Sequence, residues 1–262
     1  MSQDRDLEGK VVLVTGGSRG IGRSIALAFA SHGSHVVLTG RTQKTLDGVA
    51  EEIHRLGGKA LPLVCDVTNK QAVEALKGEV ATRLGTAQIL INNAGVAPAA
   101  SFLEMPDHLW EEVLKVNLIG TYYCCKVFLP EMIAAKWGRI INIASIVAKV
   151  AYSHTSAYTT SKHAVLGLTR SLAIEMARLG VTVNAICPGY VETDLTLNNA
   201  RLLAEKTGKR LEEALTLLKG SSPQKRLITP EEVADLAVML ASKSADGITG
   251  QAINIDGGAV MV

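Results

Sequence analysis

The sequence predicts an α/β fold in which a mostly parallel sheet of about seven strands is covered by helices on both faces. Short runs rich in β-branched residues alternate with longer helical patterns along the chain. These runs are apolar throughout, as strands buried on both faces are. The first run leads into a glycine-rich turn at residues 16–22, an arrangement typical of such sheets. The length suits one large domain, and no linker or repeat interrupts it, so we expect a single domain over residues 1–262.

The elements follow from the alternation of apolar runs and helical periodicity. The expected strands are residues 10–15, 36–39, 60–64, 89–92, 139–145, 181–187 and 252–255, and the expected helices are residues 20–32, 43–56, 69–84, 107–135, 156–179 and 230–242.

One segment, at about residues 191–229, breaks this rhythm. It contains no expected strand, and residues 198–219 indicate one or two amphipathic helices. An insertion of this length after a strand is typical of a lid over a substrate site.

The composition excludes several classes of protein. A net charge of +2 gives no reason to expect nucleic acid or an anionic membrane as a partner. The polar opening, residues 1–6, does not resemble a signal peptide, and no run reaches the roughly 20 apolar residues of a membrane span. The four cysteines lack metal-ligand spacing and form no disulfide framework. We therefore expect a cytoplasmic protein without a metal site.

The glycine-rich turn carries the first functional prediction. Gly16, Gly20 and Gly22 follow the apolar run 11–15 directly, and a helical pattern begins behind them. This order lets backbone approach a diphosphate at a helix N-terminus, where free N–H groups and the helix dipole favour negative charge. The turn predicts dinucleotide binding, although glycines alone also fit an ordinary tight turn.

The same turn also fits the G-x-S-x-G elbow of a serine hydrolase, with Ser18 as nucleophile. In that fold an earlier strand usually supplies the oxyanion loop, whereas here the motif follows the first strand. The elbow also gives Gly22 no role, whereas a dinucleotide turn needs it for close helix packing. The context favours the dinucleotide site.

Three further residues predict the chemistry. Tyr158 and Lys162 are four positions apart near the start of an expected helix, and Ser145 ends a strand at the same sheet edge. A nearby ammonium is expected to lower the tyrosine pKa from about 10, so that Tyr158 can transfer protons near neutral pH. A serine hydroxyl can donate to a carbonyl oxygen that gains negative charge. With a nicotinamide cofactor, these residues can reduce a ketone.

Together with other motifs, these residues resemble the short-chain dehydrogenase/reductase family over essentially the whole chain. The matching motifs are Thr15-Gly-Gly-Ser-Arg-Gly-Ile-Gly22, Cys65-Asp66-Val67, Asn92-Asn93-Ala94-Gly95, Asn117, Ser145, Tyr158-x-x-x-Lys162 and Pro188-Gly189. The resemblance implies a Rossmann-type sheet and a catalytic tetrad of Asn117, Ser145, Tyr158 and Lys162. In it Tyr158 is the acid/base, Ser145 polarises the carbonyl, Lys162 holds the nicotinamide ribose, and Asn117 holds a relay water.

The resemblance also implies which residues bind the cofactor. They are Gly16, Ser18, Arg19, Gly20, Ile21, Gly22, Arg41, Asp66, Val67, Asn93, Ala94, Gly95, Tyr158, Lys162, Pro188, Gly189, Val191 and Thr193.

The end of the second strand indicates which dinucleotide is bound. An acid there binds the ribose 2′-OH of NAD, but this chain has Thr39-Gly40-Arg41. Arg19 in the glycine turn can face the same position, and two guanidinium groups suit a 2′-phosphate. We therefore expect NADP(H).

The substrate is less sharply indicated. The approach to Ser145 and Tyr158 has no carboxylate clamp and is expected to be lined by the apolar residues Val96, Ala97, Ile146, Val147 and Ala148. Tyr152 and Tyr190 are further candidates to border the substrate. The overall pattern resembles reductases of 3-oxoacyl groups carried on acyl carrier protein or coenzyme A. A dehydrogenase or reductase of another secondary alcohol, or of a cyclic or aromatic ketone, is the alternative, and a non-catalytic NADPH sensor is a remote one because Tyr158 and Lys162 are both present.

The last two expectations concern partners. Lys206, Lys209 and Arg210 in the lid are candidates to meet the phosphates of an acyl thioester, although nearby glutamates equally describe a mixed-charge solvated face. The family resemblance further implies a homotetramer in which helices 107–135 and 156–179 pair between subunits.

Overall fold

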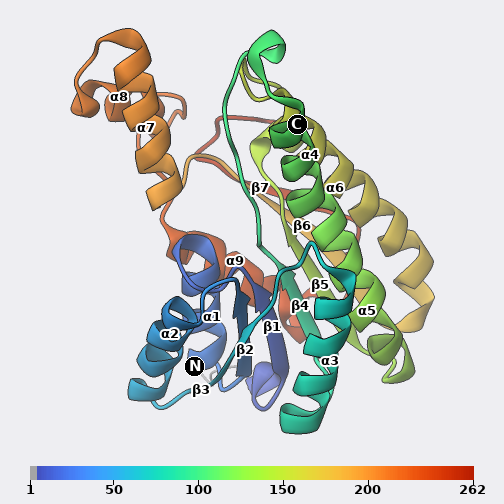
Figure 1. Cartoon of the computed structure of the whole chain (residues 1–262). Helices are drawn as coiled ribbons and strands as arrows, with labels where there is room; N and C mark the ends of the chain where they lie inside the picture. The colour runs from blue at the N-terminus through green and yellow to red at the C-terminus, as the bar shows by residue number, and fades with distance from the viewer. Residues whose placement is uncertain (1–4) are drawn as a thin grey trace.

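Seven parallel strands form one sheet in the order β3-β2-β1-β4-β5-β6-β7 in the computed structural model, which describes residues 5–262 (Figure 1). The expected seven-stranded sheet is confirmed. The strands are β1 (Val11–Thr15), β2 (His35–Gly40), β3 (Lys59–Val64), β4 (Ile89–Asn92), β5 (Gly138–Ile143), β6 (Val181–Pro188) and β7 (Ala252–Ile255). The α-helices are α1 (Gly20–Ser31), α2 (Gln43–Arg55), α3 (Lys70–Leu84), α4 (Asp107–Leu114), α5 (Gly120–Ala134), α6 (Ser156–Met176), α7 (Asp194–Thr207), α8 (Leu211–Lys219) and α9 (Pro230–Ala241).

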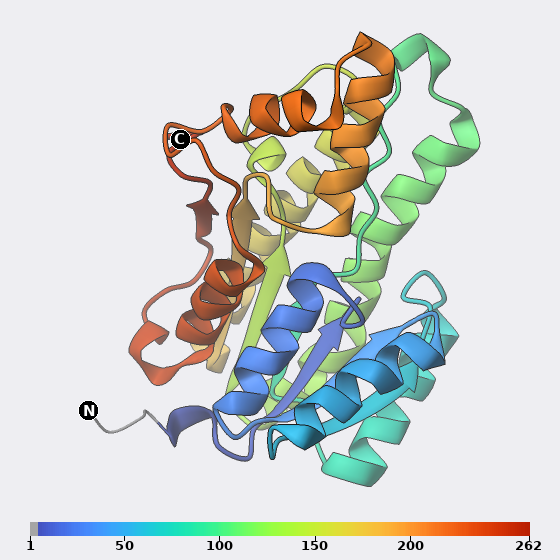
Figure 2. The same ribbon diagram turned by 90° about the vertical axis from the view of Figure 1, so that its left-hand side faces the viewer.

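The two faces of the sheet are covered by different helices (Figures 1 and 2). Val12 and Val14 of β1 pack with the apolar sides of α1, α2 and α9, whereas Val11 and Leu13 pack with those of α3, α5 and α6. Successive side chains of a strand point to opposite faces, so both sets are buried. This arrangement explains why the strand reads as an unbroken apolar run.

The strand order places the ligand site at the centre of the sheet. From β1 the chain builds outward through β2 and β3, and it then crosses to β4 on the other side of β1. Such a reversal leaves a crevice at the carboxyl ends of the two central strands, where ligands bind in open α/β sheets.

The expected helix over residues 107–135 is divided by a π-helical segment. After α4 the chain runs through Lys115–Ile119 with π-helical hydrogen bonding before α5 begins at Gly120. Asn117 lies within this segment and is buried. Local widenings of this kind often occur at functional sites, and apolar periodicity does not reveal them because both flanking helices keep their own pattern.

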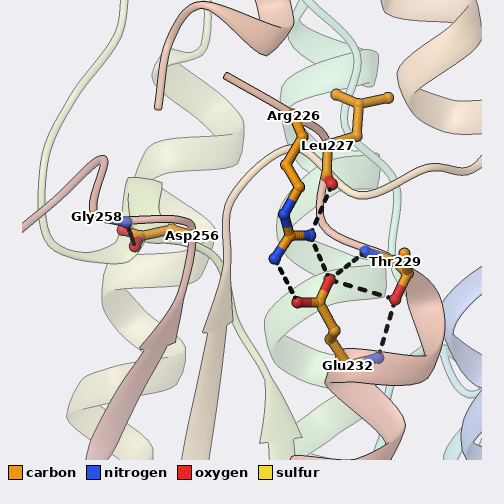
Figure 3. Close-up of polar contacts among 6 residues, drawn as sticks. All are labelled: Arg226, Leu227, Thr229, Glu232, Asp256 and Gly258. Carbon is orange, nitrogen blue, oxygen red and sulfur yellow. Dashed lines mark hydrogen bonds and ion pairs between the residues drawn. The ribbon is translucent and has the colours of Figure 1, made fainter. Parts of the chain in front are cut away.

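The expected lid consists of α7 and α8, and the segments at its two ends are joined to each other just beyond β6. Val191 and Ile228 form a parallel bridge, in which the Ile228 N–H donates to the Tyr190 carbonyl at 2.9 Å. Just beyond, Arg226 forms two hydrogen bonds with the Glu232 carboxylate, which also accepts from the backbone N–H of Thr229 (Figure 3). The lid helices project from this joined base (Figure 1).

Within the described residues, we searched for membrane-spanning helices and for groups of metal-binding side chains. No helix within residues 5–262 is long and apolar enough to cross a bilayer. The same residues contain no group of three or more His, Cys, Asp or Glu side chains placed to hold a metal ion. Most of the polar opening lies outside the described residues.

Candidate active site

A cleft of about 1080 Å³ lies along the carboxyl ends of the central strands. Its floor comes from the turns after the first six strands, β1 to β6. Leu195 and Asn198 of the lid line one wall, and His108 and Lys115 line the opposite wall. The cleft therefore lies at the crevice that the strand order defines.

The glycine turn fits a diphosphate because its backbone is packed too closely for side chains. A Cβ at Gly22 would lie 2.2 Å from the Gly16 carbonyl oxygen, and Gly20 has φ +51°. Asn93 fixes the turn by donating to the carbonyls of Thr15 and Gly16, both at 3.0 Å. Arg19 precedes α1 without a side-chain hydrogen bond to the N–H groups of the first turn. These N–H groups are therefore available to an anion in the cleft.

The far end of the cleft is positively charged around one carboxylate. Arg41 and Lys115 both line it and both act electrostatically on Asp66. Burial alone would raise the pKa of Asp66, but hydrogen bonds from Thr68 and these two cations outweigh it and hold the pKa below its usual value. Arg41 lies where the sequence predicts a partner for a 2′-phosphate, and Lys115 adds a cation that the sequence analysis did not single out.

Ser145, Tyr158 and Lys162 meet at the other end of the cleft. Ser145 lies two residues beyond the end of β5, and its hydroxyl is close enough to Tyr158 to favour the phenolate, which opposes the effect of burial on the phenol's pKa. Lys162 lies one helical turn after Tyr158 in α6, and its ammonium is 5.7 Å from the centre of the tyrosine ring. That ammonium donates to the Ile143 carbonyl at 2.7 Å, which fixes it at the sheet end.

The expected lowering of the Tyr158 pKa is wrong for the protein without nucleotide. Burial of the phenol raises the pKa of Tyr158 to about 12, and the nearby Ser145 hydroxyl only partly opposes this rise. Burial also lowers the pKa of Lys162 to about 8. Desolvation therefore dominates, because it disfavours the charged form of both groups.

Asn117 holds the chain that passes over the cleft. Its side chain accepts from the Val96 N–H and donates to the Val96 carbonyl, each at 2.9 Å, and also donates to the Ser161 hydroxyl at 2.9 Å. Both amide protons are thereby used. A relay water on Asn117 stays a prediction, and the Asn117 side chain clamps the backbone of Val96.

The structure places nearly all the predicted cofactor residues along the cleft. Gly22 is the exception, because it lies behind the turn and its role there is close packing. The residues that line the cleft are Gly16, Ser18, Arg19, Gly20, Ile21, Arg41, Asp66, Val67, Asn93, Ala94, Gly95, Tyr158, Lys162, Pro188, Gly189, Val191 and Thr193.

The predicted substrate residues divide into two groups. Ser145 and Tyr158 line the cleft, whereas Val147, Tyr152 and Tyr190 do not. Val147 is buried beneath the chain's last residues, and Tyr152 is 42% exposed. Val96 and Ala97 line the cleft as the sequence indicates, and Leu195 of the lid joins them. The sequence pointed to residues near Ser145 along the chain, but the fold turns Val147 away from the cleft.

The lid cations lie away from the catalytic end. Lys206, Lys209 and Arg210 do not line the main cleft. Lys209 and Arg210 border a separate shallow hollow together with Glu212 and Glu213, and Arg210 pairs with Glu213 at 3.2 Å. Their position at the mouth of the cleft, which the sequence suggested, is not reproduced.

The fold and this site together define a nucleotide-dependent oxidoreductase, and the comparisons agree. The profile of the short chain dehydrogenase family matches residues 10–202, and the chain belongs to this family. The resemblance drawn from the motifs is thereby confirmed.

Characterised relatives extend over almost the whole chain. The chain is 40% identical to the 3-oxoacyl-(acyl-carrier-protein) reductase FabG of Aquifex aeolicus (strain VF5) over 253 residues, which cover 96% of this chain and 98% of that one. It is 39% identical to D-beta-hydroxybutyrate dehydrogenase of Rhizobium meliloti (strain 1021), with 95% and 98% covered. A crystal structure of a variant actinorhodin polyketide ketoreductase with NADPH superimposes with a TM-score of 0.93 at 36% identity, covering 95% of this chain and 97% of that one.

Proposed function

We propose that this protein is an NADPH-dependent ketoreductase that reduces a 3-oxoacyl thioester to the 3-hydroxyacyl product. The observation that carries the proposal is that Ser145, Tyr158 and Lys162 line the same cleft as Arg41, which lies at its opposite end. The named relatives include 3-oxoacyl and polyketide ketoreductases. The apolar Val96, Ala97 and Leu195 suit a ketone better than a charged keto acid.

The chain's residues divide the work between binding and proton transfer. NADPH, when bound, supplies the hydride, and the glycine turn, Arg19 and Arg41 hold its phosphates. Ser145 donates a hydrogen bond to the substrate carbonyl as charge develops on the oxygen. Tyr158 keeps its proton at neutral pH and delivers it to that oxygen. Lys162 holds the nicotinamide ribose and offers a positive charge that stabilises the resulting phenolate.

The carrier of the acyl group is coenzyme A or acyl carrier protein. The relatives from Aquifex aeolicus and Thermotoga maritima are named for acyl carrier protein substrates, which supports acyl carrier protein as the carrier. The lid cations Lys206, Lys209 and Arg210 are candidates to meet the carrier's phosphates, but their distance from the main cleft limits them to peripheral contacts.

We also propose a homotetramer in which α5 and α6 pair between subunits. Tyr122 on α5 and Ile174 on α6 are 41% and 81% exposed. Large apolar groups left in water in this way are typical of surfaces that a second copy covers. Light scattering should give four times the mass of one chain, and Ile174→Lys should reduce it.

The reaction is tested by following NADPH oxidation with acetoacetyl-coenzyme A, a 3-oxoacyl carrier protein, cyclic ketones and 3-hydroxybutyrate with NADP. Thioesters should be reduced with the highest kcat/KM. A clear preference for 3-hydroxybutyrate or a cyclic ketone would instead support the alternative substrate classes.

Tyr158→Phe tests the assigned acid. Loss of a general acid typically costs a hundred- to ten-thousandfold in rate, so kcat should fall by roughly this factor. NADPH affinity, measured by nucleotide fluorescence, should hardly change. Tyr152→Phe is the matched control, because Tyr152 does not line the cleft and its variant should retain activity. If Tyr158→Phe remained active, the proposed chemistry would be wrong.

A further inference from the structure

Lys149 lies in the turn that follows Ser145, and its ammonium is bound to the opposite end of the chain. Ser145 caps the short helical turn Ile146–Ala148 by accepting from the Val147 N–H at 3.3 Å. The Lys149 ammonium donates to the Ala252 carbonyl at 2.7 Å and to the backbone oxygen of Val262 at 2.8 Å. Charge-assisted hydrogen bonds of this length are the stronger kind. The turn is thus tied to β7 and to the last residue of the sequence at once.

The tail, residues 256–262, is folded back to reach this position. The Asp256 carboxylate accepts from the N–H groups of Gly258 and Val260, both at 2.9 Å (Figure 3 shows the first contact). Asn254 donates to the Val260 carbonyl at 2.6 Å. Gly257 and Gly258 have φ +64° and +84°, the left-handed region that glycine adopts without strain. The bend is therefore specified by its own residues.

The folded tail covers the Ser145 turn and Tyr158 from behind. Val260 is buried against Ile146 and Val147, and the half-buried Tyr158 and Ala259 pack on the same cluster. Both groups that contact the substrate carbonyl therefore rest, through the turn and the ring, on residues of the tail. A small displacement of such groups costs much rate, because the reacting atoms must be aligned.

We propose that the tail is a positioning element for Ser145 and Tyr158, held in place by Lys149 as the positioning residue. The inference rests on the proposed function in so far as Ser145 and Tyr158 contact the substrate carbonyl. Lys149 itself contacts two backbone oxygens and does not line the cleft. Its removal should therefore act on the catalytic step rather than on binding.

Three variants test the role of Lys149. Lys149→Met keeps most of the side-chain length but loses the charged donor, whereas Lys149→Arg keeps a cationic donor. Lys59→Met is the matched control, since Lys59 is an exposed lysine at the start of β3, the edge strand farthest from β7. Lys149→Met should lower kcat by about ten- to a hundredfold, while KM and NADPH affinity change less than about threefold. Lys149→Arg should recover most of the rate, and Lys59→Met should match wild type.

Amide hydrogen exchange provides a readout that does not depend on turnover. In Lys149→Met, peptides covering residues 145–150 and 257–262 should exchange faster, while those of α3 stay unchanged. Val260→Ala should accelerate exchange in the same two segments, because it loosens the apolar packing of the tail while keeping the two Lys149 hydrogen bonds. Unchanged exchange there, or kcat and NADPH affinity falling together, would overturn the proposal. If the wild-type enzyme reduced no thioester, only the proposed function would be contradicted. The exchange pattern would still test whether Lys149 holds the tail against the Ser145 turn.

Discussion

At the scale of single residues, the site depends on two groups whose protonation is set by burial. Tyr158 and Lys162 are both held in their neutral forms more strongly than in water. Tyr158 is protonated at neutral pH, which is the form that a ketone reduction needs. The reverse oxidation needs the phenolate, which burial of the phenol disfavours.

A pH titration checks this directly. The difference in ultraviolet phenolate absorbance between wild type and Tyr158→Phe should show no ionisation of Tyr158 near pH 10, where an ordinary tyrosine is half ionised, because its pKa is about 12. The folded chain keeps this proton while the unfolded chain releases it. Stability should therefore fall as pH rises from about 10 towards 12. A phenolate that appears near neutral pH in nucleotide-free protein would contradict the burial argument.

Arg41 determines the expected preference for NADPH. Arg41→Asp removes a phosphate partner and puts a carboxylate where the 2′-phosphate is expected. A charge-assisted contact is worth roughly 1.5–3 kcal/mol, so NADPH affinity should fall tenfold or more while NADH affinity rises or stays constant. Fluorescence titration with both nucleotides measures this, and Arg55→Asp at the end of α2 is the control. Tighter binding of NADH than of NADPH by wild type would be evidence against the cofactor assignment.

At the scale of elements, the lid separates a fixed base from an outer part. The base is held by the bridge between Val191 and Ile228 and by the ion pair of Arg226 with Glu232 of α9. Leu195 and Asn198 near the start of α7 line the cleft, whereas α8 lies farther out. Substrate selection should therefore depend on the first turns of α7 more than on the charges of α8.

Neutralising the outer charges tests this division. The triple variant Lys206→Gln, Lys209→Gln, Arg210→Gln should raise KM for acetoacetyl-coenzyme A only several-fold, because exposed ionic contacts contribute about 0–1 kcal/mol each and weaken with salt. KM for a short 3-oxo ester without phosphates should stay constant. Equal effects on both substrates would indicate a disturbed lid, and no effect on either would leave these charges as a solvated face.

At the scale of the whole molecule, the candidate active site and a stabilising cluster of charged and aromatic side chains lie at opposite ends of the sheet. At the amino end of β5, the buried Arg139 pairs with Asp246 and stacks on Trp137, with 4.4 Å from the guanidinium carbon to the ring centre. Lys10 lies over the same ring at 4.3 Å. The cluster joins the segments before β1 and β5 to the segment before β7, far from the carboxyl ends that form the cleft.

Asp246→Ala should therefore reduce stability without reducing activity. It leaves the buried Arg139 guanidinium without its carboxylate, and an unsatisfied buried group costs about 1–3 kcal/mol. Denaturant unfolding should show a loss of this size, while kcat/KM of the folded enzyme stays constant. The exposed Asp235→Ala is the control. A large loss of kcat/KM in folded Asp246→Ala would contradict this separation.

The sequence by itself determined the sheet, the family and most of the residues that line the cleft. Apolar runs and glycines act locally, since a strand buried on both faces must be apolar, and Gly16 and Gly20 take positive φ values that other residues rarely adopt. The four-residue spacing of Tyr158 and Lys162 likewise fixes one helix face. These features depend on near neighbours in the chain, and pattern reasoning can find them.

Only the tertiary structure decided which side chains meet and what burial does to them. Val147 was expected at the substrate but lies beneath Val260, more than a hundred positions later in the chain. The pKa of Tyr158 rises rather than falls, because desolvation depends on every element packed around the phenol. The tie from Lys149 to Val262 had no sequence signal. Burial and long-range contacts depend on how distant segments pack, so the spacing of residues along the chain cannot predict them.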